Sequence, residues 1–320
     1  MKTENFLTKT SVVCLIAGIC SFLWGSAFPC IKIGYELFSV ASDDTASQIL
    51  FAGIRFTLAG ILAVLFGCIS KRKLILPEKK DIMPICILSL FQTILQYFFF
   101  YIGLANTTGV KSSVIIGANV FVVIILSALI FKTEKITTKK IIGSIVGFAG
   151  IILINLSGLT DGSMKFTGEG FIFLSTVAYA ISSGLMKNYS KKHDTVLLSG
   201  YQFIFGGIVM TATGFIMGGT IVASSGKAVL MLIYLAFISA AAYSLWSMLL
   251  KHNDVSSVAI FGFMNPMFGF ILSAILLNER GEAFGIKGIA AIILVCAGIF
   301  IVNKKEKREL DYCRKTYNML

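Results

Sequence analysis

Three basic side chains, Lys32, Arg55 and Lys187, lie within long apolar stretches of the sequence. A charge near the centre of a bilayer costs about 2.5–3.5 kcal/mol on insertion scales, so an embedded charge suggests a function. Lys32 and Lys187 fall near the ends of their stretches, where a lysine can reach water by snorkelling, so a gating role and a structural role both stay open. Arg55 lies deeper, about 10 Å at 1.5 Å per residue. If these groups contact a ligand, they favour a carboxylate or a zwitterion over a cation.

The sixteen acidic residues all lie in predicted loops, tails or the ends of apolar stretches. A carrier that exchanges a cation for protons needs an embedded carboxylate both to bind the cation and to titrate. The two histidines, His193 and His252, also fall in predicted loops, so no buried proton relay is indicated. The sequence therefore disfavours proton-coupled cation binding and a sodium site built on carboxylates.

Uncharged polar and aromatic side chains supply the other candidate ligand contacts. Gln92 and Gln96 are spaced to share one helix face, with Tyr97 beside them, although an interhelical hydrogen bond is an equally good account of the glutamines. We interpret Tyr101 and Trp246, near the ends of their stretches, as members of interfacial aromatic belts. The predicted substrate-binding set is Trp24, Arg55, Gln92, Gln96, Tyr97, Asn119, Tyr243 and Asn265.

Two prolines interrupt the hydrogen bonding of apolar stretches. Pro29 removes the bond to the carbonyl of Gly25, and Pro266 removes the bond to the carbonyl of Gly262. Each site is either a hinge with free carbonyl groups or a static kink that neighbouring helices tolerate. The predicted gate or hinge set is Gly25, Pro29, Lys32, Lys187, Gly262 and Pro266.

The elements that must position these groups follow from composition. The chain has 320 residues, of which 56% are hydrophobic and 14% are charged, whereas a soluble protein carries about 25% charged residues. Apolar stretches long enough to span a bilayer recur along the whole chain, and without water only helices satisfy their backbone groups. The sequence predicts an all-α membrane protein whose ten spans cover residues 12–34, 48–70, 82–104, 110–131, 138–157, 169–188, 196–218, 228–250, 256–277 and 285–302.

The net charge of +12 has a distribution that fits membrane topology rather than nucleic-acid binding. With the N-terminus inside, twenty lysines and arginines fall on the cytoplasmic side and five on the outer side. This bias predicts that both termini are cytoplasmic. The first apolar stretch lacks a convincing cleavage site and is expected to remain as a helix.

The two halves of the chain repeat the same ordered pattern. Trp24 precedes Lys32 by the same spacing with which Tyr179 precedes Lys187, and Val110 to Glu134 aligns without gaps on Val255 to Glu279. Each half ends on a similar phrase, GFAGIILIN and VCAGIFIVN. Five spans per half place the second copy in the opposite orientation, an arrangement from which alternating-access carriers are built. We expect repeats at 1–160 and 161–303, followed by a basic cytoplasmic tail at 304–320.

The opening Trp24-Gly25 with Phe28 and Lys32, the Arg-Phe pair of the second span and Glu134 at the end of the fourth resemble the EamA-type branch of the drug/metabolite transporter superfamily. The resemblance covers about residues 12 to 303. It implies a ten-helix secondary transporter of the bacterial inner membrane, often an exporter of amino acids or other small metabolites. Members often carry a proline in the fourth span, where this chain has Asn119.

These features predict a secondary transporter that moves an amino acid-like compound or an organic anion by alternating access, with export favoured. A multidrug or cationic compound exporter of the same fold is the alternative, and a channel or membrane sensor is a third. An enzyme is disfavoured because no cluster of catalytic groups lies at membrane depth. No phosphate-binding loop is present, and we expect no cofactor, no metal and no nucleic-acid partner. The expected partners are a small molecule and the lipid bilayer, and the oligomeric state is open.

Overall fold

The computed structural model describes residues 6–41, 43–107, 109–155, 165–276 and 286–303. Within these ranges all regular secondary structure is helical, which confirms that the fold is all-α. Six helical runs in the described chain are long and apolar enough to cross a membrane: Thr10–Leu37, Thr45–Lys71, Lys79–Leu104, Phe166–Tyr189, Thr195–Ile216 and Gly226–His252. Shorter apolar helices cover Val114–Leu129, Val255–Gly269 and Ile289–Asn303.

The described part of the chain consists of helices and the turns between them. In chain order they are α2 (Thr10–Leu37), α3 (Thr45–Lys71), α4 (Lys79–Leu88), η1 (Ser89–Leu95), α5 (Gln96–Ala105), α6 (Gly109–Gly117), α7 (Asn119–Leu129), α8 (Thr138–Asn155), η3 (Phe166–Gly170), α9 (Phe171–Tyr189), α10 (Thr195–Ile216), α11 (Gly226–His252), α12 (Val255–Ala259), η4 (Ile260–Phe263), α13 (Met264–Leu276) and α15 (Ile286–Asn303).

Local capping fixes the starts of α3 and α10. The carboxylate of Asp44 accepts a hydrogen bond from the Ser47 amide at 3.0 Å at the start of α3, and Asp194 does the same for Leu197 at 2.9 Å in α10. Each cap satisfies an amide that has no partner within its own helix. The α3 helix ends at Arg72, whose φ of 50° reverses the chain.

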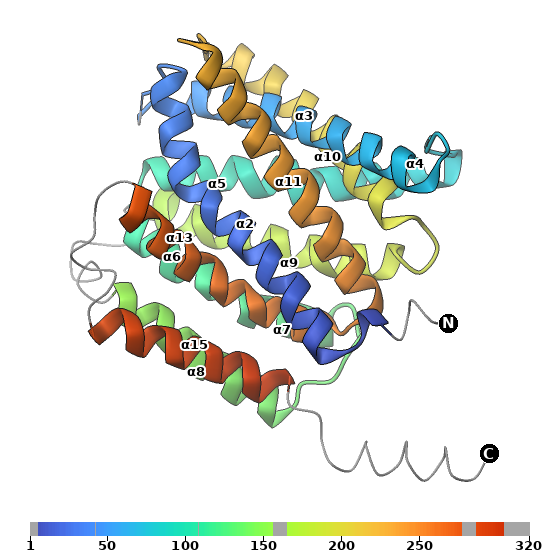
Figure 1. Ribbon diagram of the computed structural model, residues 1–320, viewed down its shortest axis with the longest axis vertical. Helices are drawn as coiled ribbons and strands as arrows, with labels where there is room; N and C mark the ends of the chain where they lie inside the picture. Colours follow the sequence, from blue (N-terminus) through green and yellow to red (C-terminus); the bar gives the residue numbers. More distant parts are fainter. Residues whose placement is uncertain (1–5, 42, 108, 156–164, 277–285, 304–320) are drawn as a thin grey trace.

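The helices form a bundle with two long pairs at its edges (Figure 1). The α3 and α10 helices pack along each other at one edge, and α8 packs along α15 at the other. Between them α2 contacts α11 and α13, while α9 contacts α5 and α7. Small residues allow the close approach: a Cβ atom on Gly60 of α3 would lie 2.5 Å from the carbonyl oxygen of Gly200 in α10.

Four of the apolar stretches contain an irregular segment, and the sixth begins within the π-helix η3. The third passes through a π-helix at Ser89–Leu95, and the fourth is divided between α6 and α7 at Ala118. The ninth passes through a 3-10 segment at Ile260–Phe263, directly before Pro266 removes a backbone donor. By contrast, α2 continues through Pro29 without interruption.

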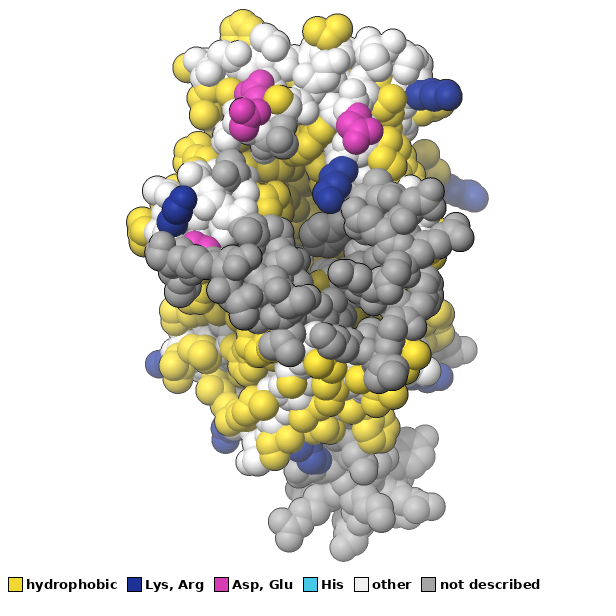
Figure 2. Space-filling model, turned by 90° about the vertical axis from the view of Figure 1, so that its left-hand side faces the viewer, with side chains coloured by type: hydrophobic (Ala, Val, Ile, Leu, Met, Phe, Trp, Pro, Cys, Tyr) yellow, Lys and Arg dark blue, Asp and Glu magenta, His cyan; other side chains and the backbone are white. Residues whose placement is uncertain are grey.

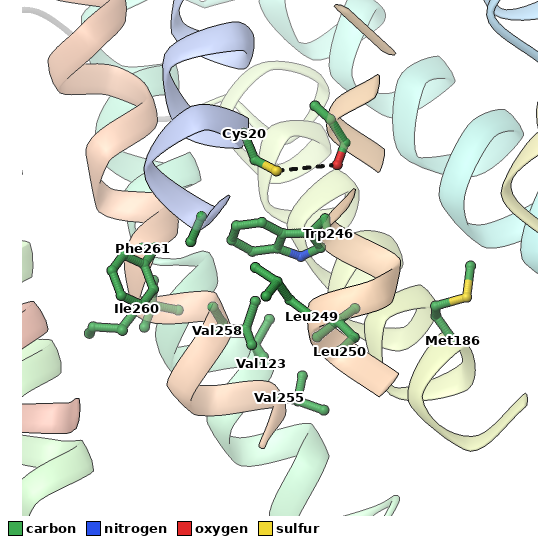
Figure 3. Close-up of a cluster of buried hydrophobic side chains, with 14 of the residues drawn as sticks. Cys20, Val123, Met186, Trp246, Leu249, Leu250, Val255, Val258, Ile260 and Phe261 are labelled. Carbon is green, nitrogen blue, oxygen red and sulfur yellow. Dashed lines mark hydrogen bonds between the residues drawn. The ribbon is translucent and has the colours of Figure 1, made fainter. Parts of the chain in front are cut away.

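The two ends of the bundle differ. We call the end where α2 begins and α15 ends the N-end. There an apolar cluster joins α2, α7, α9, α11 and α12, with Cys20, Val123, Trp246 and Val258 all buried (Figure 3). We call this cluster the plug. Figure 2 looks toward the opposite end, where the surface is hollowed near the middle of the view and apolar side chains line part of the hollow.

Candidate functional site

Arg55 lies at the centre of the candidate site. It projects from α3 and is 3% exposed. Its Nη2 donates a hydrogen bond to Ser239 Oγ of α11 at 3.0 Å, and its guanidinium lies 4.9 Å from the centre of the Phe56 ring. Nε and Nη1 have no hydrogen-bond partner, and no carboxylate of the described chain pairs with this arginine. A buried cation without an anion costs several kcal/mol, so the arrangement favours an anionic ligand.

Four tyrosines, Tyr35, Tyr97, Tyr101 and Tyr243, pack in one cluster with Phe56, the neighbour of Arg55 in the sequence. They come from α2, α5 and α11. The hydroxyl groups of Tyr97 and Tyr243 form a hydrogen bond of 2.9 Å, which links the third and eighth apolar stretches. Phenolic groups donate and accept hydrogen bonds while their rings remain apolar, so this set can contact both ends of an amphipathic ligand.

An aromatic wall continues from this set. The ring of Trp24 lies 5.1 Å from Tyr243 and 5.0 Å from Trp246 in edge-to-face contacts, and its Nε1 has no hydrogen-bond partner. The prediction that Tyr101 and Trp246 form interfacial belts is wrong, because they are 2% and 3% exposed and pack inside the bundle. Their position near the ends of apolar stretches gave no information about which way the rings point.

The predicted glutamines lie beside this wall. Gln92 is buried in the π-helix and Gln96 begins α5, and the side-chain oxygens of both lack a hydrogen-bond partner. The sequence did not single out Gln202, which is fully buried and accepts a hydrogen bond from Thr93 at 2.6 Å. A π-helix widens the turn and often occurs at functional sites. Here it brings Thr93 against α10 while Gln92 stays buried.

Asn119 and Asn265 each lie at an interruption in a span. Asn119 begins α7 directly after the break at Ala118, and Asn265 follows the 3-10 segment. The side-chain oxygens of both have no hydrogen-bond partner. The fourth stretch is therefore interrupted although it lacks the proline expected there.

The hinge candidates occupy different environments. Gly262 lies inside the 3-10 segment, next to Phe261, whose carbonyl accepts a hydrogen bond from Ser21 at 3.1 Å. Gly25 lies in a continuous helix, where a Cβ atom would come within 2.4 Å of the Phe268 Cβ atom. The irregular backbone at Gly262 fits a hinge better than the close packing at Gly25 does.

The two embedded lysines also differ in their surroundings. Lys32 is exposed near the far end of α2. Lys187 donates hydrogen bonds to the carbonyl oxygens of Lys251 at 3.3 Å and Asn253 at 2.6 Å, and so caps the end of α11. A lysine at this position compensates carbonyl groups that have no partner within the helix.

Polar contacts that the sequence did not reveal join the first and second halves at the N-end. Asp81 Oδ1 lies 2.6 Å from Nδ1 of His193, and Lys71 pairs with Asp194. Burial alone would raise the pKa of Asp194, but hydrogen bonds from Lys71 and from the amides of α10 outweigh it and lower the pKa. These groups lie in predicted loops or helix ends, so only the folded chain brings them together.

Comparison with known proteins supports the function class that this interior suggests. The EamA-like transporter family matches residues 11–156 and 166–304. The chain belongs to this family. The two matched segments correspond closely to the two halves that repeat the sequence pattern.

Relatives carry consistent names. An uncharacterized transporter of Archaeoglobus fulgidus is 26% identical over 298 residues, which cover 91% of this chain and 97% of the relative. The uncharacterized transporter YvbV of Bacillus subtilis is 25% identical and covers 95% of both chains. A solved crystal structure covers 92% of this chain and 97% of its own with a TM-score of 0.74 at 15% identity, which shows a shared fold. This EamA-like chain is therefore a multi-pass membrane transporter.

Proposed function

We propose that this EamA-like protein is a secondary transporter that moves a small metabolite with a carboxylate group by alternating access. The substrate lies between two inverted repeats of five helices each, at 1–160 and 161–303. The buried guanidinium of Arg55, with its Nε and Nη1 unpaired, is the observation that carries the proposal. Binding a carboxylate supplies the anion that Arg55 lacks among the described residues.

Helix packing supports the two-repeat architecture. Each helix of one repeat has an equivalent in the other, so contacts between repeats should occur in matching pairs. The contact between α2 and α11 is matched by the one between α9 and α5, and the contact between α2 and α13 is matched by the one between α9 and α7. Exchanging the repeats maps the α3–α10 pair and the α8–α15 pair onto themselves. The breaks in the fourth and ninth stretches also lie at equivalent positions. The gapless alignment pairs Asn119, the first residue of α7, with Met264, the first residue of α13. Pairs exchanged in this way are expected of an inverted repeat.

Charge distribution gives the orientation that we propose. The N-end carries most of the lysines and arginines, so it faces the cytoplasm of the cell, with both termini on that side and the hollow opening outward. Export across the inner membrane is the direction that the family resemblance favours. The basic tail at 304–320 then lies in the cytoplasm.

Binding to the purified protein tests the substrate class. Thermal unfolding in detergent is measured with amino acids, organic acids, nucleosides and cationic dyes, and then repeated on Arg55→Gln and Gln96→Ala. We expect a carboxylate compound to raise the unfolding temperature of the native protein, and Arg55→Gln to abolish this rise. Lys32→Gln is the matched control, since it removes an exposed cation outside the proposed site.

Two outcomes would contradict the proposal. Stabilisation by cationic dyes alone, unchanged in Arg55→Gln, would favour a multidrug exporter of the same fold. Flux through reconstituted protein that does not saturate and shows no counterflow would favour a channel. Saturable counterflow of a carboxylate compound that is lost in Arg55→Gln supports the carrier.

A further inference from the structure

Glu134 connects the two halves of the chain at the N-end. Its side chain is 4% exposed although the residue follows the end of α7. The carboxylate accepts a hydrogen bond from the amide of Ser256 at 3.0 Å and another from its hydroxyl at 2.5 Å. Ser256 belongs to α12, the first segment of the ninth apolar stretch. Hydrogen bonds to a charged group are among the strongest in proteins, so this contact holds α7 and α12 together.

Charged groups from two further helices, α8 and α9, and from the N-cap of α12 surround this contact. Lys140 of α8 is 8% exposed, and its Nζ lies 2.5 Å from Glu134 Oε2 and 3.8 Å from Asp254 Oδ2. Lys187 of α9 is within electrostatic range of both acids. Lys140, in the first half, therefore compensates the charge of Glu134 and holds its carboxylate in place, while the carboxylate binds Ser256 in the second half.

The packing of the fourth and ninth stretches is asymmetric. In the repeat alignment, α6 corresponds to α12 and η4, and α7 corresponds to α13. The α7 helix packs against α12 beside the plug, whereas the equivalent pair, α6 and α13, shares no comparable contact in the described chain. An inverted repeat reaches its second state by exchanging such equivalent contacts, so the α7–α12 contact must open in that state.

We propose that Glu134 and Ser256 form a latch that keeps the N-end closed and must break before the plug opens there. The proposal rests on the alternating-access function above but is independent of the substrate. It explains why an acid and a hydroxyl that face no ligand site are buried against each other across the two halves.

A native cysteine reports the state of the plug. Cys20 is fully buried in the plug, and its thiol lies 3.5 Å from the carbonyl oxygen of Ala242 (Figure 3). Opening of the N-end admits water and a small maleimide to this thiol. The alkylation rate of Cys20 is followed by mass spectrometry of peptides from the full-length protein, with the rate of the same thiol in the denatured protein as reference.

Two variants and two controls define the test. Glu134→Gln keeps the side-chain shape but removes the charge, and Ser256→Ala removes the hydroxyl. We expect each to raise the alkylation rate of Cys20 about tenfold, since a charge-assisted hydrogen bond is lost from the closed state alone. Ser257→Ala, on the neighbouring residue, and Glu78→Gln, at an exposed carboxylate of the same end, leave the rate unchanged.

The latch is refuted if Cys20 in both variants reacts at the native rate. It is also refuted if the controls raise the rate equally, because the effect would then be general loosening of the fold. The assay uses no substrate, so a latch that behaves as expected in a protein that binds no carboxylate compound would overturn only the proposed substrate. Conversely, carboxylate transport with an unresponsive Cys20 would overturn only the latch.

Discussion

Replacing Arg55 by methionine is expected to stabilise the ligand-free protein while abolishing binding. The guanidinium is 3% exposed, has one hydrogen bond to Ser239 and faces no carboxylate of the described chain. Replacing a buried ion pair by apolar side chains is often neutral or stabilising by about 1–4 kcal/mol, and a buried charge without a counter-ion has even less Coulomb attraction to lose. The contact with the Phe56 ring contributes about 0.5–2 kcal/mol in the other direction.

The loss of the arginine leaves no new unsatisfied group on its partner. Ser239 keeps a hydrogen bond to the carbonyl oxygen of Leu235 at 3.2 Å. The net change is then a gain of about 1–2 kcal/mol, which for a chain of 320 residues corresponds to a rise of roughly 1.5–3 °C in the unfolding temperature. If Arg55 belonged to an ordinary structural ion pair, the substitution would lower the stability, because its partner would remain buried without a counter-ion.

Thermal unfolding of the detergent-purified protein without ligand, followed by tryptophan fluorescence, measures this change. Lys32→Met is the matched control, since it removes an exposed cation, and its unfolding temperature should stay at the native value. A fall of the Arg55→Met unfolding temperature by several degrees would refute the reasoning, because it would mean that the guanidinium is already well paired. Stabilisation with retained carboxylate binding would show that the site lies elsewhere.

The remaining predictions concern packing, pH and the hydroxyl bridge. Gly60→Ala should lower stability by about 1–3 kcal/mol in a denaturation experiment because the new methyl group meets backbone of α10, whereas Gly18→Ala, with open space around it, should not. The pKa of Asp194 is lowered in the folded state, so its contribution is complete above the unfolded pKa of about 3.9 and is lost as the pH falls further. Acid unfolding curves should therefore be shallower in Asp194→Asn, and Lys71→Met should reproduce part of the change. Tyr97→Phe removes the hydroxyl bridge between the third and eighth stretches, and we expect it to alter the affinity for substrate in a binding titration while the unfolding temperature changes little.

Much of the architecture could be predicted from sequence because the bilayer restricts the choices. Long apolar stretches must be helical, since lipid offers no partner for backbone groups. The predicted stretch at 48–70 contains most of α3, and the stretch at 196–218 closely matches α10. The depth of Arg55 also followed from its distance along the helix. The family assignment agrees with the resemblance carried by the ordered repeat of weak motifs.

The direction in which each side chain points was not predictable in the same way. Lipid and the protein interior are both apolar, so hydrophobicity does not distinguish the helix face that meets lipid from the face that meets another helix. This is why Tyr101 and Trp246 were assigned to the membrane interface although both are buried. For the same reason, nothing in the sequence indicated that Tyr35 packs in the cluster of Phe56 or that Ser239 binds Arg55.

The sequence by itself determined that lipid surrounds most of the chain and that the apolar stretches are helical. It also determined that the motifs recur in the same order and that an arginine, but no acid, is embedded. Only the tertiary structure decided which groups meet across the two halves. Glu134 and Ser256 are far apart in the chain, and the local sequence around each gives no sign that the other is its partner. Their contact depends on how α7 and α12 are rotated and placed, which is set by the packing of the whole bundle rather than by any local pattern.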